Sequence, residues 1–147
     1  MKLSLKVLAI AISLPIVLTA CSGVQDKPSI DAEQLQHHQW QLTHINGQPF
    51  ILDENYPSPT LTLDEEMMAS GNAGCNQFFG QAELNNNRFR IERMGMTMKM
   101  CFGEVMDTEQ LVSQSLTDWN DVIVTQETLT LKNDAHTLTY TRYDWVK

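Results

Sequence analysis

Apolar and polar residues alternate along several short stretches of the chain. Alternation with a period of two predicts β-strands that turn one face towards a core. It places Leu61 and Leu63 on one face of residues 60–63, and it turns Phe89 and Ile91 inward within residues 88–93. The same pattern predicts further strands at residues 40–43, 67–70, 78–84, 122–124, 129–131 and 138–140.

Turn-forming residues separate these stretches. Asn46-Gly47, residues 85–87 and Asn133-Asp134 tolerate left-handed backbone, so they predict tight turns between neighbouring strands. Residues 71–74 hold two glycines and predict a bend that depends on them. Residues 94–100 continue the strand before them, with a methionine at every second place.

The period changes in residues 107–119, which we expect to form a helix. Its apolar residues fall on one helical face, and they are Leu111, Val112, Leu116 and Trp119. Asp107 and Gln110 resemble a capping box, so the helix is expected to begin there. A shorter helix is predicted at residues 31–38, capped by Asp31 or Ser29.

Many short strands and one helix predict a mainly β (α+β) fold. We expect a small antiparallel curved sheet or barrel, with the helix at residues 107–119 covering an opening. The length of 147 residues suits one domain. The 42% of hydrophobic residues is typical of a folded domain. A net charge of −8 argues against a protein that binds nucleic acid by neutralising phosphates.

The first twenty residues predict a signal peptide. Lys2 and Lys6 precede an apolar run at residues 7–18, which has the length of a signal h-region and is too short to span a bilayer. Residues 18–21 (Leu-Thr-Ala-Cys) resemble a bacterial lipobox. That resemblance implies cleavage before Cys21 and its modification by a diacylglyceride and an N-acyl chain such as palmitate. The alternative is an ordinary cleaved signal followed by a chance cysteine.

The lipobox sets the expected domain organisation and location. Residues 21–30 predict a tether, and residues 31–147 predict the folded domain. Ser22 follows the cysteine, which in enterobacterial lipoproteins implies export to the outer membrane. We therefore expect a periplasm-facing monomer that contacts the membrane through its lipid anchor and needs no cofactor. Its protein partner is unknown from sequence.

Two cysteines remain once Cys21 carries lipid. Cys75 and Cys101 are an even pair, which in an oxidising compartment indicates a disulfide. Two free thiols, or half of a metal site, are the alternatives. Zinc is poorly supported because no histidine or cysteine lies beside either residue.

Four methionines, Met94, Met96, Met98 and Met100, would project from one face of a strand. Thioethers are soft donors that suit Cu(I), although ligands about 7 Å apart on one strand would need a second strand, such as residues 67–68, to complete a site. The alternatives are a core face filled by adaptable side chains and a groove for a lipid or peptide.

Other polar residues give weaker signals. Asn76 follows a tight bend and is expected to satisfy loop backbone, with a ligand contact as the alternative. The histidines lack metal-binding spacing, and the carboxylate pairs lie in loop-like stretches, so both are expected at the solvated surface. Basic residues gather at Arg88, Arg90, Arg93 and Lys99, which suggests a solvated strand face or a contact with phosphates or an acidic partner.

The order of these landmarks resembles the META domain (DUF306) family, and within it the HslJ-like lipoproteins. The specific blocks are Gly74-Cys75-Asn76-x-Phe78-Phe79-Gly80 and Thr97-Met98-x-Met100-Cys101. Supporting matches are Trp40-x-Leu42, Gly47, the residue 61–63 strand, the residue 107–119 helix and the closing pair at residues 129–131 and 138–140.

The resemblance implies a β-rich domain with one helix, closeness of Cys75 to Cys101, and a role in heat shock, envelope stress or antibiotic tolerance. It implies no catalytic residues, so we expect a non-enzymatic protein. The alternatives are a carrier of a small apolar ligand or lipid, and a Cu(I)-binding protein that uses the face from Met94 to Met100.

Overall fold

The computed structural model describes residues 28–51 and 55–143. It has mainly β structure with one α-helix, as predicted. Nine strands and two helical segments are described: η1 (Ala32–Gln34), β1 (Gln39–Ile45), β2 (Gln48–Pro49), β3 (Thr60–Leu63), β4 (Met68–Asn72), β5 (Gln77–Asn85), β6 (Arg88–Met96), α1 (Glu104–Thr117), β7 (Asn120–Val124), β8 (Thr128–Lys132) and β9 (Thr137–Arg142).

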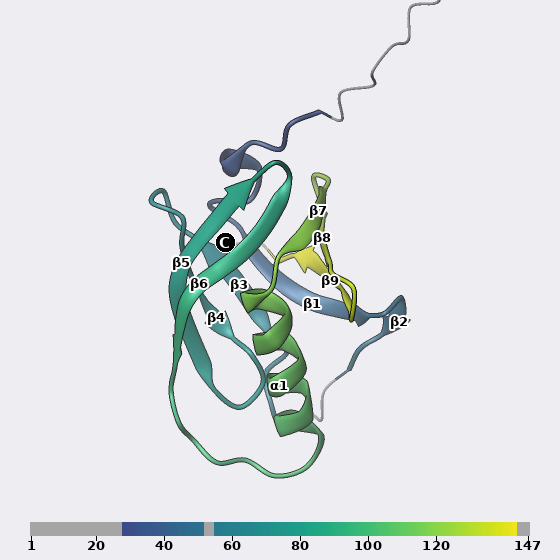
Figure 1. Ribbon diagram of the computed structural model, residues 1–147. Coiled ribbons are helices and arrows are strands. Elements are labelled where there is room, and N and C mark those ends of the chain that lie inside the picture. The colour runs from purple at the N-terminus through teal and green to yellow at the C-terminus, as the bar shows by residue number, and fades with distance from the viewer. Residues whose placement is uncertain (1–27, 52–54, 144–147) are drawn as a thin grey trace, which may run out of the picture.

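The strands form one antiparallel sheet that curves until its ends meet (Figure 1). From β3 onwards each strand pairs with its successor, β1 pairs with β3, and β1 also pairs with β9. In that closing pair Trp40 lies opposite Arg142 and Leu42 opposite Tyr140, and the register shifts after Leu42. The short β2 forms a hairpin with the end of β1, where His44 pairs with Pro49 and Ile45 with Gln48. The predicted curved sheet or barrel is therefore a closed one.

The alternating apolar residues point into this barrel and fill it. Leu61, Leu63, Phe89 and Ile91 are at most 1% exposed, as the sequence pattern predicted. The largest interior side chain, Trp40, donates its indole N–H to the carbonyl oxygen of Leu35, 2.9 Å away. Other fully buried side chains belong to Leu42, Phe78, Leu116, Leu129, Leu131 and Tyr140.

The helix α1 lies between β6 and β7 in the chain (Figure 1). It packs Val112 and Leu116 into the core. Strands β6 and β7 pair only at Arg88 with Asp121 and at Phe89 with Asn120. The amide of Asn120 donates to the carbonyl oxygen of Ser115 at 2.7 Å, which ties the end of α1 to β7. The helix thus completes the core where the sheet is weakly paired, as expected for a covering helix.

The predicted start and end of α1 were wrong by a few residues. The helix begins at Glu104 with Gly103 as its N-cap, and it ends at Thr117. Val105, which precedes the predicted start at Asp107, is buried against the rest of the domain, so tertiary packing extends the helix towards its N-terminus. Trp119 falls outside the helix.

The predicted methionine strand was also wrong. Strand β6 ends at Met96, and Met98 and Met100 lie in the following loop. Before that point the register with β5 shifts near Gly80, and Arg93 has a positive φ of 49°. The four methionines therefore do not share one face of a regular strand.

The N-terminal part of the domain agrees in outline with the sequence. The helical segment is shorter than predicted, but Asp31 caps it and forms a capping box with Gln34. Ile30, expected in the tether, already packs against the core, so the ordered structure starts slightly before residue 31. The predicted signal peptide and Cys21 lie outside the described residues.

Candidate functional site

The bend between β4 and β5 meets the N-terminal half of α1. Gly74 at this bend has a φ of 151°, a conformation that L side chains rarely adopt. A Cβ atom at Gly74 would lie 2.8 Å from the carbonyl oxygen of Val105 and 3.2 Å from the Cβ of Glu109. The glycine therefore permits the backbone of the bend to touch the helix.

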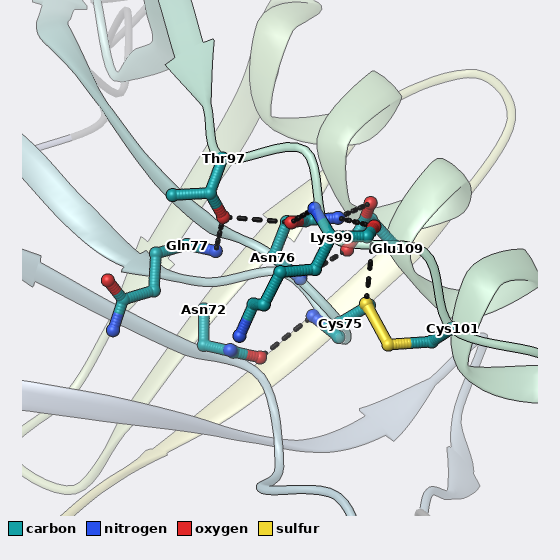
Figure 2. The surroundings of a disulfide bond; sticks show 9 residues. Asn72, Cys75, Asn76, Gln77, Thr97, Lys99, Cys101 and Glu109 are labelled. Atoms are coloured by element: carbon teal, nitrogen blue, oxygen red, sulfur yellow. Dashed lines mark hydrogen bonds between the residues drawn. A yellow bond between two sulfur atoms is a disulfide. The ribbon is translucent and has the colours of Figure 1, made fainter.

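Asn76, next along this bend, is 3% exposed and uses its whole side-chain amide (Figure 2). Its Nδ2 donates to Glu109 Oε1 at 2.9 Å and to the carbonyl oxygen of Lys99 at 3.0 Å. Its Oδ1 accepts from the Lys99 backbone N–H at 2.6 Å and from Thr97 Oγ1 at 2.8 Å. An amide has two donors and two acceptor positions, so none is left for a ligand. The backbone role expected of Asn76 is the one observed.

Glu109 is the partner that sequence reasoning missed. It is 8% exposed, and its second carboxylate oxygen accepts from the backbone N–H of Asn76 at 2.5 Å. Buried carboxylates need such compensating donors. Its position in the sequence was the signal that could have indicated burial. Glu109 lies four residues after Val105, three before Val112 and seven before Leu116, so it shares their helical face.

A disulfide joins Cys75 to Cys101, with their Cα atoms 6.0 Å apart. It links the bend to the loop that follows β6, beside the hydrogen bonds of Asn76 to Lys99 (Figure 2). The expected pairing is thus present in the structure. The disulfide joins the bend to the loop, and Glu109 joins the helix to both through hydrogen bonds to Asn76. We call this unit the Asn76 junction (Asn76, Cys75, Lys99, Cys101 and Glu109).

The predicted methionine site is divided by the structure. Met94 and Met96 pack partly against the core from β6. Met98 and Met100, in the loop, are 98% and 83% exposed. A Cu(I) site shared by all four is therefore not supported by this arrangement.

The interior does not support the carrier alternative either. Trp40, Phe78, Phe89 and Tyr140 occupy it, and each is at most 1% exposed. An apolar ligand would have to displace these core side chains. Burial raises the pKa of Tyr140 well above its usual 10.0 because the phenolate would lose its hydration.

Of the four basic residues, Arg88, Arg90 and Arg93 lie on β6, whereas Lys99 lies in the loop that follows it. Arg90 pairs with Glu83 at 2.6 Å, and its guanidinium lies 4.7 Å from the ring centroid of Trp119. Arg88 lies 5.7 Å from the same ring. Within residues 28–51 and 55–143, no three His, Cys, Asp or Glu side chains gather closely enough to hold a metal ion.

The closed antiparallel barrel and the Asn76 junction define a small β-barrel domain whose covering helix is held to it by the buried hydrogen bonds of Glu109. The chain belongs to the META domain family, whose profile matches residues 33–145. It is 33% identical to Heat shock protein HslJ of Escherichia coli (strain K12) over 137 residues, which cover 92% of this chain and 95% of that protein.

Two solved NMR structures resemble the fold. One has a TM-score of 0.68 and 34% identity, and the match covers 80% of this chain and 99% of that one. The other, from Burkholderia xenovorans, has a TM-score of 0.62 and 22% identity, and the match covers 95% of this chain and 99% of that one. Among the described residues, neither helical segment is long and apolar enough to cross a bilayer.

Proposed function

We propose that this protein is a lipid-anchored, non-catalytic protein of the outer membrane that faces the periplasm and acts in the heat-shock response of the cell envelope. The observation that carries the proposal is the likeness to Heat shock protein HslJ over almost the whole chain. The lipobox-like residues 18–21 supply the proposed anchor, and Cys21 is the residue that would carry the lipid.

The start of the domain is held in a way that suits an anchor. Asn87, in the turn between β5 and β6, accepts from the Ile30 backbone N–H at 2.7 Å and donates to the Pro28 carbonyl oxygen at 3.0 Å. The backbone carbonyl of Asn87 also accepts from Val122 at 2.9 Å. Residues 28–30 are therefore tied to the barrel at one place.

This attachment favours one orientation at the membrane. The N-terminal segment leaves the barrel at the end that carries the β5–β6 turn, and the loop before α1 lies at the opposite end (Figure 1). The residues between Cys21 and Pro28 extend to roughly 25 Å at most. In the proposed arrangement, the β5–β6 turn faces the membrane and the 97–103 loop faces the periplasm.

The proposed non-catalytic role agrees with the state of the polar groups in the Asn76 junction. Catalytic side chains need a free lone pair or proton within reach of a substrate. Here Asn76 and Glu109 are buried and bonded to each other, and the amide of Asn76 also holds the backbone of Lys99. Their interactions stabilise the fold, so the proposal assigns the protein a binding or supporting role.

The anchor is tested by mass spectrometry of the protein expressed from its full-length gene in a Gram-negative host. We expect the chain to begin at Cys21, to carry three acyl chains and to fractionate with the outer membrane. The Cys21→Ser variant should lose the lipid and leave the membrane fraction. An unacylated wild-type chain that still begins at Met1 and stays in the cytoplasm would contradict the anchor.

The stress role is tested separately. Protein level should rise after a temperature upshift, and deletion should reduce survival under heat or envelope-directed antibiotics, with rescue by the wild-type gene but not by Cys21→Ser. Equal survival of the deletion and parent strains, together with an unchanged protein level, would contradict the stress role and leave the anchor result standing.

A further inference from the structure

Among the residues that the structure describes, the exposed thioethers are concentrated in one loop. Met98 and Met100 are 98% and 83% exposed, and the next most exposed methionine, Met68, is 41% exposed. The remaining methionines of the described residues are half-buried: Met67, Met94, Met96 and Met106. Phe102, in the same loop, is 82% exposed. Apolar side chains therefore occupy every second position outward along residues 98–102.

The intervening residues hold this loop to the domain. Thr97 donates its backbone N–H to the Gln77 carbonyl oxygen at 3.0 Å and its hydroxyl to Asn76. Lys99 is bound through both its N–H and its carbonyl to the Asn76 amide, and Cys101 is crosslinked to Cys75. None of these contacts uses the side chain of Met98 or Met100. The loop therefore presents two thioethers to solvent on a fixed backbone.

We propose that Met98 and Met100 form a modification site, at which hypohalous acids such as hypochlorous acid oxidise the two thioethers to sulfoxides. In each step a sulfur–oxygen bond forms and the oxygen–chlorine bond breaks. Sulfur loses two electrons, chlorine gains them and leaves as chloride, and a proton goes to solvent. The reverse step reduces the sulfoxide with two thiols, which become a disulfide and release water, as in sulfoxide reductases.

The bonding of the cysteines and the exposure of the methionines make this loop the first target of an oxidant. Thiolates are the usual first targets of such oxidants, but both cysteines of the described residues, Cys75 and Cys101, are already joined as a disulfide. Exposure then decides among the thioethers. Met98 and Met100 are at least twice as exposed as Met68, so they meet oxidant first.

Oxidation here changes the surface and leaves the fold intact. A sulfoxide is polar, so its formation in a core disrupts packing, whereas on a solvated side chain it removes apolar surface only. The Asn76 junction stays in place because its bonds are made by Asn76, Lys99 and Glu109. Oxidation thus makes the exposed surface of Met98 and Met100 polar while the barrel remains folded.

The proposal depends on the proposed location only for the supply of oxidant. In purified protein the chemistry needs no cell, whereas in cells it needs the domain to face the periplasm, which external oxidants reach. Failure in purified protein would overturn the modification site. If Met98 and Met100 are oxidised in purified protein but not in cells treated with oxidant, the site is not modified in the cell. That result would contradict the proposed periplasmic location and leave the chemistry of the loop standing.

The test is oxidation of the purified full-length Cys21→Ser protein, which has no cysteine besides Cys75 and Cys101, with one equivalent of hypochlorous acid. Reduction and capping of the disulfide and digestion with trypsin follow. Cleavage after Arg93 and Lys99 leaves Met94, Met96 and Met98 in one peptide, so fragmentation compares them directly. We expect Met98 and Met100 each to carry at least about fivefold more sulfoxide than Met94 or Met96. Equal oxidation of Met94 and Met98 would overturn the proposal.

Two variants sharpen the result. Met98→Leu combined with Met100→Leu should abolish the fast phase of oxidant consumption, whereas the matched Met68→Leu should leave it unchanged. The urea midpoint of the wild-type chain should be the same before and after oxidation of the loop, and sulfoxide reductases with a thiol reductant should restore its mass. A lowered midpoint would show that the oxidised methionines belong to the core and would overturn the proposal.

Discussion

The carboxylate of Glu109 binds Asn76 twice, through the backbone N–H at 2.5 Å and through the side-chain amide at 2.9 Å. These bonds join the middle of α1 to the bend that carries Cys75. Because both residues are buried, each would leave unpaired polar atoms behind if the other were removed. The pair is therefore central to how the helix is held on the barrel.

Glu109→Gln should lower the free energy of unfolding by about 1–3 kcal/mol. A glutamine offers one acceptor oxygen where the carboxylate offers two, so one Asn76 donor loses its partner. Urea unfolding followed by tryptophan fluorescence measures the change. Glu127→Gln, the same replacement at an exposed turn residue, is the control and should stay within about 0.5 kcal/mol of wild type. Equal effects of the two replacements would refute the structural role of Glu109.

Reduction of the disulfide should also destabilise the domain. Cys75 and Cys101 are 26 residues apart in sequence, and closing a loop of that length stabilises a fold by about 3–4 kcal/mol on chain-entropy grounds. The urea midpoint should therefore fall when reductant is added. The Cys75→Ala, Cys101→Ala double variant should match the reduced protein and be insensitive to reductant. Two reactive thiols in the unreduced wild type would contradict the bond.

Gly74→Ala should be more damaging than Gly103→Ala. Both glycines have positive φ, so alanine is strained at either position. Only at Gly74 would the new Cβ also meet the helix, 2.8 Å from the Val105 carbonyl oxygen, while nothing lies within 4 Å at Gly103. We expect a loss of about 1 kcal/mol for Gly103→Ala and at least about 2 kcal/mol for Gly74→Ala. Similar thermal midpoints for the two variants would contradict the close approach.

Tyr140 should make the fold sensitive to alkaline pH. Its hydroxyl finds no hydrogen-bond partner among the described residues, and burial raises its pKa above the usual 10.0. The folded state keeps this proton where the unfolded chain releases it, so stability present below pH 10 is lost as pH rises beyond that value. The loss amounts to about 1.4 kcal/mol per pH unit for one group.

Tyr140→Phe isolates that effect. It removes the titrating group and an unpaired buried hydroxyl, so at neutral pH it should leave stability unchanged or slightly higher. Above pH 10 the variant should lose stability more slowly than wild type. Urea unfolding at a series of pH values gives both slopes, and parallel curves would exclude Tyr140 as the cause.

The strands could be predicted from sequence because their faces differ in chemistry. Leu61 and Leu63, or Phe89 and Ile91, must turn to the same side, and a closed barrel gives that side a core. The same argument failed for Met98 and Met100. An alternating pattern forms a strand only where a neighbouring strand supplies backbone hydrogen bonds. At Lys99 the backbone N–H and carbonyl are instead bound by the side-chain amide of Asn76.

The candidate site was predicted in part. Parity and family resemblance brought Cys75 and Cys101 together, and the bend before Asn76 indicated a backbone role. Glu109 was missed because a carboxylate on a helix face usually meets solvent, and sequence does not show which bend packs against that face. The early start of α1 was missed for a similar reason, since the packing of Val105 depends on the rest of the barrel.

Sequence alone determined the β-rich class, the positions of most strands and turns, the presence of one helix and the family, because these follow from local period, turn chemistry and motif spacing. Only the tertiary structure decided that β1 closes against β9, that Glu109 meets Asn76, and that Met94 and Met98 lie in different environments. Each of these depends on contacts between residues far apart in the chain, and such contacts are set by packing and burial.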